Sequence, residues 1–320
     1  MAKEFLITVD LGGTKILSAL LDKKNNIVQR VKVATSTKNG ADGLVKDIVA
    51  SIKELLKKSK LKESNISFVS IGVPGTVNPE TGIISVAPNL NIKNYNIKKN
   101  IQKSVSMPVL LENDVNLAGL GIKKFEFKDK VENMLVVFVG TGIGGALFFN
   151  GKVYRGSSFY AGEIGHMLVN ENGSLSTNGV EFEKLASRTA IVNGIVSQIK
   201  KKKKSVLKEY VEKNKKIKSK AIAAAIKEKD KITIEEVTKA CKIIGNVLGS
   251  ITTLLNLDTI VLGGGLIEAN HKFMLPKIKS AFRKSVMKDV GKITKIVVTQ
   301  FGDDAPLLGG AALAEEFTAK

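Results

Sequence analysis

Four apolar runs that each end in glycine constrain the fold more than any other feature of the sequence. They are FLITVDLGG (5–13), ISFVSIGVPG (66–75), MLVVFVGTGIGG (134–145) and TIVLGGG (259–265). Short apolar runs bounded by glycine are typical of buried strands. Segments with helical spacing lie between them, such as ADGLVKDIVASIKELLKKSK (41–60), whose apolar residues share one face. Strands that alternate with helices predict an α/β fold.

Two of these runs resemble each other. FLITVDLGGTKILSALL and MLVVFVGTGIGGALFF both read as a strand, a glycine turn and a second strand-like segment, with Gly-Thr at 13–14 and 140–141. Duplicated halves that face each other across a cleft would explain the match, and chance similarity of two short segments is the alternative. The lysine-rich segment 200–232 is expected to form exposed helices and connections on one of the lobes.

The net charge of +20 raises the question of nucleic-acid binding. Nearly all of the basic residues are lysines, and aromatic residues make up only 5% of the chain, with no tryptophan to stack on bases. The composition therefore favours solvated lysine faces over a nucleic-acid surface, and we expect no nucleic-acid partner.

The same composition indicates a globular protein of the cytoplasm. The single cysteine, Cys241, excludes an intrachain disulfide and lies on an apolar helical face, where a buried thiol is expected. The first strand begins within five residues of Met1, so we expect neither a signal peptide nor an upstream DNA-binding module. The longest apolar run contains four glycines and is shorter than the roughly 18 residues that a spanning helix needs, so no membrane partner is expected.

Three glycine turns are candidates for binding phosphate. DLGGTK (10–15) does not fit the P-loop spacing and precedes a returning strand, so a plain hairpin is the alternative reading. GTGIGG (140–145) fits G-x-G-x-x-G but is followed by ALFFNGKVY, which contains a hairpin signal and opens no helix. We therefore reject a dinucleotide site there. Together with GGG at 263–265, the turns predict a nucleotide cleft.

Two further segments carry polar groups that suit chemistry. ENDVN (112–116) follows an apolar run, and Asp114 could accept a proton from a substrate hydroxyl; the local pattern alone favours a helix cap at Asp114. In AGEIGHM (161–167), His166 lies three residues after Glu163, and Glu183 follows a loop rich in Gly, Asn, Ser and Thr. A metal site, a sugar site and a solvated loop are all compatible with this second segment.

In combination, these motifs resemble the ROK family of repressors, open reading frames and kinases. The matching segments, in the family's order and approximate spacing, are DLGGTK, GVPGTV (72–77), APNL (87–90), LLENDVN (110–116), GTGIGG, AGEIGHM, IVLGGG and the closing APLLGGAALA (305–314). The resemblance covers nearly the whole chain. It implies a two-lobed actin-like ATPase fold, a duplicated ribonuclease H-like arrangement with a central cleft for nucleotide and sugar.

The resemblance also implies the residues of an active site. Asp114 looks like the general base that orients the sugar hydroxyl. A weak base is sufficient for this role, because phosphoryl transfer depends mainly on positioning. Asp10 resembles the residue that holds Mg²⁺, through water. The implied ATP-binding residues are Asp10, Gly12, Gly13, Thr14, Lys15, Thr141, Gly142, Gly264 and Gly265. The implied sugar-binding residues are Asn89, Asn113, Asp114, Glu163, His166 and Glu183.

The chain departs from the family at the structural zinc site. The family usually binds zinc through the same histidine and three cysteines, whose positions here hold Ser174, Ser176 and Glu181. Serine is a poor zinc ligand, and a simple core histidine is the other reading of His166. We expect the zinc to be absent and the loop to be held by hydrogen bonds and packing, with Phe182 filling space.

What the resemblance implies is a cytoplasmic kinase that transfers phosphate from ATP, with Mg²⁺, to the 6-hydroxyl of a hexose, glucose first. Fructose, mannose and N-acetylhexosamines remain alternative substrates, polyphosphate an alternative donor, and a non-catalytic sugar-responsive regulator an alternative of another class. The expected lobes are residues 1–113, completed by 305–320, and residues 114–304. A homodimer is expected, because the resemblance implies a family in which dimers are common.

Overall fold

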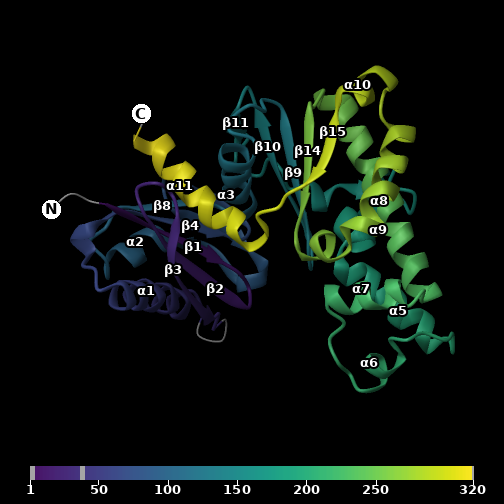
Figure 1. Ribbon diagram of the computed structural model, residues 1–320, viewed down its shortest axis with the longest axis horizontal. Helices are drawn as coiled ribbons and strands as arrows, with labels where there is room; N and C mark the ends of the chain where they lie inside the picture. Colours follow the sequence, from purple (N-terminus) through teal and green to yellow (C-terminus); the bar gives the residue numbers. More distant parts are fainter. Residues whose placement is uncertain (1–3, 37–39, 319–320) are drawn as a thin grey trace. The chain divides into compact units, whose positions relative to one another are not determined.

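The computed structural model describes residues 4–36 and 40–318 of the chain (Figure 1). The chain forms two compact units. Unit 1 contains Met1–Lys130, Val153–Ala161 and Asp303–Lys320, and unit 2 contains Val131–Lys152 and Gly162–Gly302. Within the described residues, no helix is long and apolar enough to cross a membrane.

Unit 1 is built on a sheet with the strand order β3-β2-β1-β4-β8. Its strands are β1 (Phe5–Leu11), β2 (Lys15–Leu21), β3 (Ile27–Ala34), β4 (Ile66–Val73) and β8 (Val109–Asn113). The first three strands are antiparallel neighbours, and β4 and β8 continue the sheet parallel to β1. A small sheet of β5 (Thr76–Asn78), β6 (Ile83–Ala87) and β7 (Ile92–Asn96) lies beyond β4 in the chain.

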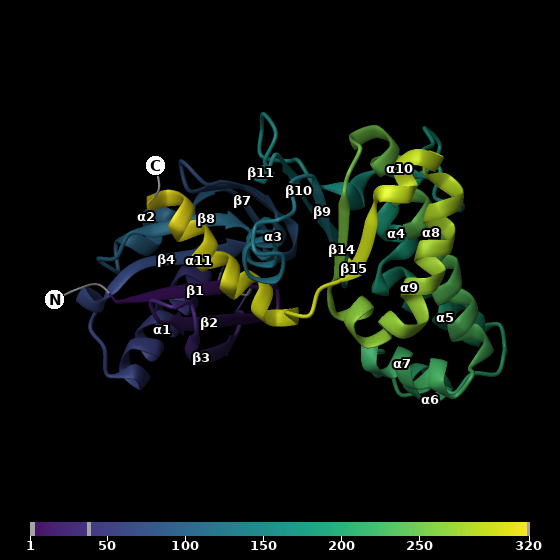
Figure 2. The ribbon, with the colours of Figure 1, turned by 45° about the horizontal axis from the view of Figure 1, so that its top comes forward.

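Helices pack on both faces of this sheet, as Figure 2 shows. They are α1 (Gly40–Ser59), α2 (Ile97–Gln102), α3 (Asp114–Gly121), which continues as a π-helical turn η4 (Ile122–Glu126), and α11 (Ala305–Thr318). The apolar face of α1 is buried in one core with Ile7 and Val9 of β1, as its spacing predicts. The opposite face receives α11, where the hydroxyl of Ser70 donates to the carbonyl of Gly310 at 2.8 Å.

Unit 2 repeats the topology of unit 1. Its sheet has the order β11-β10-β9-β14-β15, again with an antiparallel hairpin followed by parallel strands. The strands are β9 (Met134–Val139), β10 (Ile143–Phe149), β11 (Lys152–Tyr154), β14 (Thr259–Gly263) and β15 (Lys295–Val298). The internal similarity of the two glycine-turn segments is therefore a structural duplication, and the chance reading is wrong.

The helices of unit 2 surround a second core that contains Cys241, whose thiol is fully buried. They are α4 (Phe182–Ala186), α5 (Arg188–Lys200), α6 (Lys208–Glu212), α7 (Ser219–Lys227), α8 (Lys231–Leu255), α9 (Gly265–Ser285) and α10 (Lys288–Ile293). A two-stranded ribbon of β12 (Leu168–Val169) and β13 (Val180–Glu181) precedes α4. As expected, the lysine-rich segment 200–232 forms the short helices α6 and α7 and exposed connections.

The boundary between the units differs from the predicted one at residue 113. Helix α3 belongs to unit 1 because it packs against α11, so closely that a Cβ on Gly309 would collide with the Leu117 carbonyl. Residues 153–161 also return to unit 1 after β11. The sequence pattern gave no sign of this return.

Candidate active site

The turn between β1 and β2 is an exposed glycine hairpin, as the sequence predicts. The amide of Gly12 donates to the carbonyl of Lys15 at 2.9 Å, and the Thr35 hydroxyl donates to the carbonyl of Gly12 at 2.7 Å. These bonds fix the outline of the turn and leave Gly13 and Thr14 at the surface. A turn of this kind can present backbone N–H groups to a phosphate.

Two carboxylates, Asp10 and Asp114, lie near this turn. Asp10 is paired in register with Gly72 of the neighbouring strand β4, and a Cβ on Gly72 would lie 3.3 Å from the Asp114 Cα. Burial, with the negative charge of Asp114 second, raises the pKa of Asp10 to about 7, against the opposing charge of Lys15. An acidic pair of this kind suits a cation, because a cation would stabilise the ionised form of both groups.

Asn113, rather than Asp114, caps helix α3. Its side-chain oxygen accepts from the amides of Val115 and Asn116 at 2.9 and 3.0 Å, and its amide group donates to the Gly75 carbonyl. The cap that the local pattern favoured at Asp114 is therefore one residue earlier. Asp114 is the first residue of the helix, close to its positive N-terminal end.

Asn89 also lies beside the β1–β2 turn, in a short 3₁₀ turn of residues Pro88–Leu90. A Cβ on Gly13 would lie 3.7 Å from the Asn89 carbonyl oxygen. Lys15 pairs with Asp303 at 2.5 Å. Unit 1 thus brings together the predicted residues Asp10, Gly12, Gly13, Thr14, Lys15, Asn89, Asn113 and Asp114.

In unit 2, the β9–β10 turn of Gly140–Gly142 is held by the chain that follows β13. The amide of Arg188 donates to the carbonyl of Gly140, and the hydroxyl of Thr189 donates to that of Thr141 at 2.6 Å. Glu183 reaches the same turn, where its Oε2 accepts from the Ile143 amide at 3.2 Å. Unit 2 therefore places the predicted sugar ligand Glu183 beside the predicted phosphate residues Thr141 and Gly142.

Glu163 and His166 lie close to Glu183, since a Cβ on Gly165 between them would lie 3.5 Å from the Glu183 Cβ. The Nε2 of His166 is 3.9 Å from Glu163, and its Nδ1 is 3.4 Å from Oε1 of Glu181. Burial raises the pKa of Glu163, an effect that His166 opposes and Glu183 strengthens. The His166 side chain is 60% exposed, so it is no core histidine.

The predicted adenosine residues stand where β14 gives way to α9. Gly264 has φ +86°, and a Cβ there would lie 2.8 Å from the backbone of Val139, the last residue of β9. Only glycine fits such a close approach in that conformation. Gly265 opens α9 and thereby places the amino-terminal end of a 21-residue helix near the β9–β10 turn.

The loop between β12 and α4 does not fit a zinc site. In the described residues, no three His, Cys, Asp or Glu side chains come together as metal ligands, and the family's cysteine positions hold Ser174, Ser176 and Glu181. Backbone bonds and packing hold the loop instead. Phe182 is fully buried, its amide donates to the Met167 carbonyl at 2.8 Å, and Asn246 of α8 donates to the Asn172 carbonyl at 2.7 Å. The expected role of Phe182 as a space-filling residue is confirmed.

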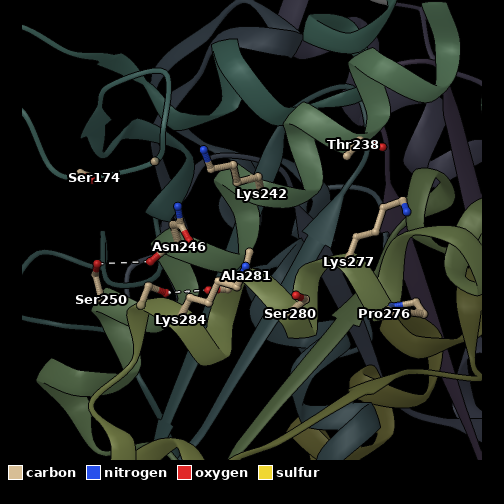
Figure 3. A pocket seen from close by; sticks show the side chains of 12 residues that line it. Ser174, Thr238, Lys242, Asn246, Ser250, Pro276, Lys277, Ser280, Ala281 and Lys284 are labelled. Atoms are coloured by element: carbon tan, nitrogen blue, oxygen red, sulfur yellow. Dashed lines mark hydrogen bonds between the residues drawn. The ribbon is translucent and has the colours of Figure 1, made fainter. Parts of the chain in front are cut away.

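A cavity of about 580 Å³ lies between α8, α9 and this loop (Figure 3). Lysines 242, 277 and 284 line it together with small polar side chains. Of the residues singled out from the sequence, Ser174 alone lines this cavity. The cavity therefore lies outside the candidate site.

Two residues of the site neighbourhood were missed in the sequence. Glu112, next to Asn113, is 1% exposed and pairs with Arg155 at 2.6 Å. The signals available were the carboxylate inside ENDVN and the scarcity of arginine, of which the chain has four. The pairing itself joins residues 43 positions apart and could not be read from the chain.

Comparison with known proteins identifies the class. A profile described as the ROK family matches residues 6–317, and the chain belongs to this family. It is 27% identical to a glucokinase from Halalkalibacterium halodurans, over 99% of this chain and 96% of that protein.

Solved structures agree on the fold. A ROK family glucokinase from Streptomyces griseus in complex with glucose and AMPPNP has a TM-score of 0.81 at 25% identity and covers 98% of this chain and 99% of that one. A ROK family transcriptional regulator, a homologue of the E. coli MLC protein, has a TM-score of 0.84 at 23% identity. The match covers 97% of this chain and 78% of that one. The protein has the actin-like ATPase fold of ROK kinases, as the sequence motifs imply.

Proposed function

We propose that the protein is an ATP-dependent hexose kinase that phosphorylates the 6-hydroxyl group, with glucose as its first substrate. The observation that carries the proposal is the pair of Asp10 and Asp114 beside the β1–β2 glycine turn, where Asp10 has a pKa of about 7. The glucokinase name of a relative across nearly the full chain supports the same assignment.

In this proposal, Asp114 accepts the proton of the sugar hydroxyl as its oxygen attacks the γ-phosphorus. The bond between that phosphorus and the β–γ bridging oxygen breaks, and ADP leaves with the bridging oxygen. Position matters more than basicity here, because the transition state of phosphoryl transfer is loose. Asn113 is held by its bonds to the start of α3 and to Gly75, and its side-chain amide is the polar group next to Asp114 that we assign to the sugar.

The residues of unit 1 fit a magnesium ion carried by ATP. Asp10 would hold it, because a divalent cation would remove the cost of ionising a buried carboxylate that has Asp114 as its neighbour. Bound Mg²⁺ would neutralise charge on the phosphates. We propose that no zinc is required, since Ser174, Ser176 and Glu181 supply no thiolate.

Unit 2 carries further residues that we assign to ligand binding. Glu163, His166 and Glu183 offer acceptors and donors that suit sugar hydroxyls, and in unit 1 Asn89 and Asn113 offer groups of the same kind. The turn at Thr141 and Gly142 and the helix start at Gly264 and Gly265 would contact the nucleotide. Fructose, mannose and N-acetylhexosamines present similar hydroxyl sets and stay candidate substrates.

The experiment is a measurement of ADP release with MgATP and a panel of glucose, mannose, fructose, N-acetylglucosamine and N-acetylmannosamine. Asp114→Asn serves as the blank, and its kcat should fall by about 10²–10⁴-fold. A parallel set with polyphosphate and detection of sugar phosphate compares the donors. A folded protein that phosphorylates none of the sugars from either donor would refute the kinase proposal.

A sugar-responsive regulator is the second candidate, because the regulator structure matches the fold with a TM-score of 0.84. This candidate function predicts DNA binding whose affinity falls steeply with salt.

We also propose a homodimer, for which the exposed apolar side chains of Leu254 and Met287 in unit 2 offer a surface. Light scattering would distinguish 34.4 kDa from twice that mass.

A further inference from the structure

Glu112 is a buried carboxylate that the proposed reaction does not use. It is the penultimate residue of β8, two positions before Asp114, and its side chain is 1% exposed. A buried charge is tolerated only when it is paired and hydrogen-bonded. Its partners therefore indicate what it is for.

Both oxygens of Glu112 are fully engaged. Oε2 accepts from Nε of Arg155 at 2.7 Å and forms an ion pair with Nη2 of the same guanidinium at 2.6 Å. Oε1 accepts from the amide of Asn113 at 3.0 Å and from the side-chain amide of Asn116 at 3.1 Å. With four donors on two oxygens, Glu112 has no capacity left for a substrate hydroxyl.

The two asparagines held by Oε1 flank Asp114 in the chain. Asn113 precedes it and caps α3, and Asn116 follows two residues later in the first turn of the same helix. Asn113 also donates to the Gly75 carbonyl, so its side chain is fixed from a third direction. One carboxylate oxygen therefore holds the chain on both sides of Asp114, through the backbone amide of Asn113 and the side-chain amide of Asn116.

Arg155 reaches Glu112 from the segment Val153–Ala161, which belongs to unit 1. The segment is closed by a bond from the Ala161 amide to the Arg155 carbonyl at 3.2 Å. The Arg155 side chain is 27% exposed, and two N–H groups of its rigid guanidinium converge on Oε2. Lysine has the charge but not this geometry.

From these contacts we infer that Glu112 and Arg155 are positioning residues for Asp114. The inference rests on the proposed kinase function. The pair fixes the start of α3, so that the Asp114 carboxylate stands where the substrate hydroxyl arrives. Misplacement of a reacting group by about 1 Å can cost about 10²-fold in rate, which sets the scale of the effect.

The test compares three variants with the wild-type chain. Glu112→Gln has one acceptor oxygen for two pairs of donors, so one pair must be lost. Arg155→Lys keeps the positive charge and loses the planar guanidinium with its two N–H groups directed at Oε2. Lys123→Met is the matched control, because Lys123 has a side chain only 10% exposed and pairs with Asp129 at 2.7 Å just beyond the other end of α3. Each variant is measured for kcat, for the KM of sugar and MgATP, and for Tm.

We expect Glu112→Gln to lower kcat by about 30–100-fold and Arg155→Lys by about tenfold, with the KM for MgATP within about twofold of wild type. Lys123→Met should keep kcat within about twofold even where its Tm falls as far as that of Glu112→Gln. A Glu112→Gln enzyme with wild-type kcat, or a kcat that follows Tm across all variants, would overturn the inference.

Amide hydrogen exchange separates this inference from the proposed function. If the wild-type chain phosphorylates no sugar, the kinase proposal fails, and exchange at Val115 and Asn116 then decides the positioning role. Faster exchange at these two amides in Glu112→Gln, but not in Lys123→Met, supports a clamp at the start of α3. Unchanged exchange overturns it.

Discussion

The β8–α3 corner of unit 1 and the segment 162–187 of unit 2 both carry proposed ligand residues, and the two regions are built by opposite means. At the corner, the Glu112 side chain accepts from the backbone amide of Asn113, and the Asn113 side chain accepts from the backbone amides at the start of α3. In segment 162–187, the His166 side chain is 60% exposed and lies 3.4 Å from the carboxylate of Glu181 and 3.9 Å from that of Glu163. Buried hydrogen bonds fix the corner, whereas the polar side chains of segment 162–187 lie at the surface and are supported by apolar packing.

The difference separates what each region must do. Group transfer depends on sub-ångström placement, which strand ends and a capped helix provide. Discrimination among sugars depends on a ring of donors and acceptors, which a loop can adjust without disturbing the reacting groups. We therefore expect changes at the corner to alter kcat and changes in the loop to alter sugar KM and stability.

The largest effect should come from the packing under the loop. Phe182→Ala removes a fully buried ring from the core that also contains Ile164 and Val169 and should lower the free energy of unfolding by about 3–5 kcal/mol. Denaturant titration measures the loss. Leu175→Ala, at a side chain 64% exposed in the same loop, is the control and should stay within about 0.5 kcal/mol. Equal losses in both variants would contradict support by packing.

The acidic pair of Asp10 on β1 and Asp114 at the corner gives the next largest effect, and it depends on pH. Asp10 has a pKa of about 7 in the folded chain against 3.8 for the free group, so the folded state binds more protons between these values and loses stability as pH rises through them. Asn does not titrate. Asp10→Asn should therefore gain stability relative to wild type between pH 4 and pH 8, by roughly 2–4 kcal/mol.

Asp22 offers a control of opposite sign for this measurement. Hydrogen bonds from Asn26 lower the pKa of Asp22, so its contribution is present above the unfolded pKa and lost as the pH falls. Asp22→Asn should lose stability at neutral pH and recover towards wild type in acid. Parallel slopes for the two variants would show that burial and Asp114 do not raise the pKa of Asp10 in the folded chain.

A smaller effect tests the contact between the phosphate turn and the sugar loop inside unit 2. A Cβ at Gly142 would collide with Oε2 of Glu183, a flexible side chain that can give way. Gly142→Ala should raise the sugar KM by about tenfold with little change in Tm. Gly140→Ala, where a Cβ meets nothing within 4 Å, is the control. An unchanged KM would mean that Glu183 does not contact the sugar.

The smallest expected effect concerns zinc. With Ser174, Ser176 and Glu181 at the family's cysteine positions, EDTA should leave Tm within about 1 °C of its value in buffer. Differential scanning calorimetry makes the measurement, and elemental analysis of the purified protein complements it. A fall of several degrees, reversed by added zinc, would place a metal in the loop.

Patterns of local origin were readable from the sequence. The glycine hairpins and helix α1 follow from apolar periods and turn residues, which act within a few positions, and Phe182 was identified because its loop needed a space-filling side chain. Asn113 and Asp114 show the limit of such reasoning. Both residues suit a helix cap. Asn113 takes this role in the structure, where it also bonds to Gly75, 38 positions away in the chain.

What could not be read depends on contacts between distant parts of the chain. The ion pair of Glu112 and Arg155 exists because residues 153–161 return to unit 1. The contact of Glu183 with the β9–β10 turn follows from the placement of α4, and no local period encodes it. The later boundary of unit 1 likewise follows from the packing of α3 against α11.

The order in which the chain visits its units has a consequence for dissecting the protein. Five consecutive segments alternate between unit 1 and unit 2, so the polypeptide crosses from one to the other at four places, after residues 130, 152, 161 and 302. A protease that cuts at any one crossing leaves three covalent connections intact. Neither unit is a contiguous gene fragment, and expressing either alone would require the chain to be spliced.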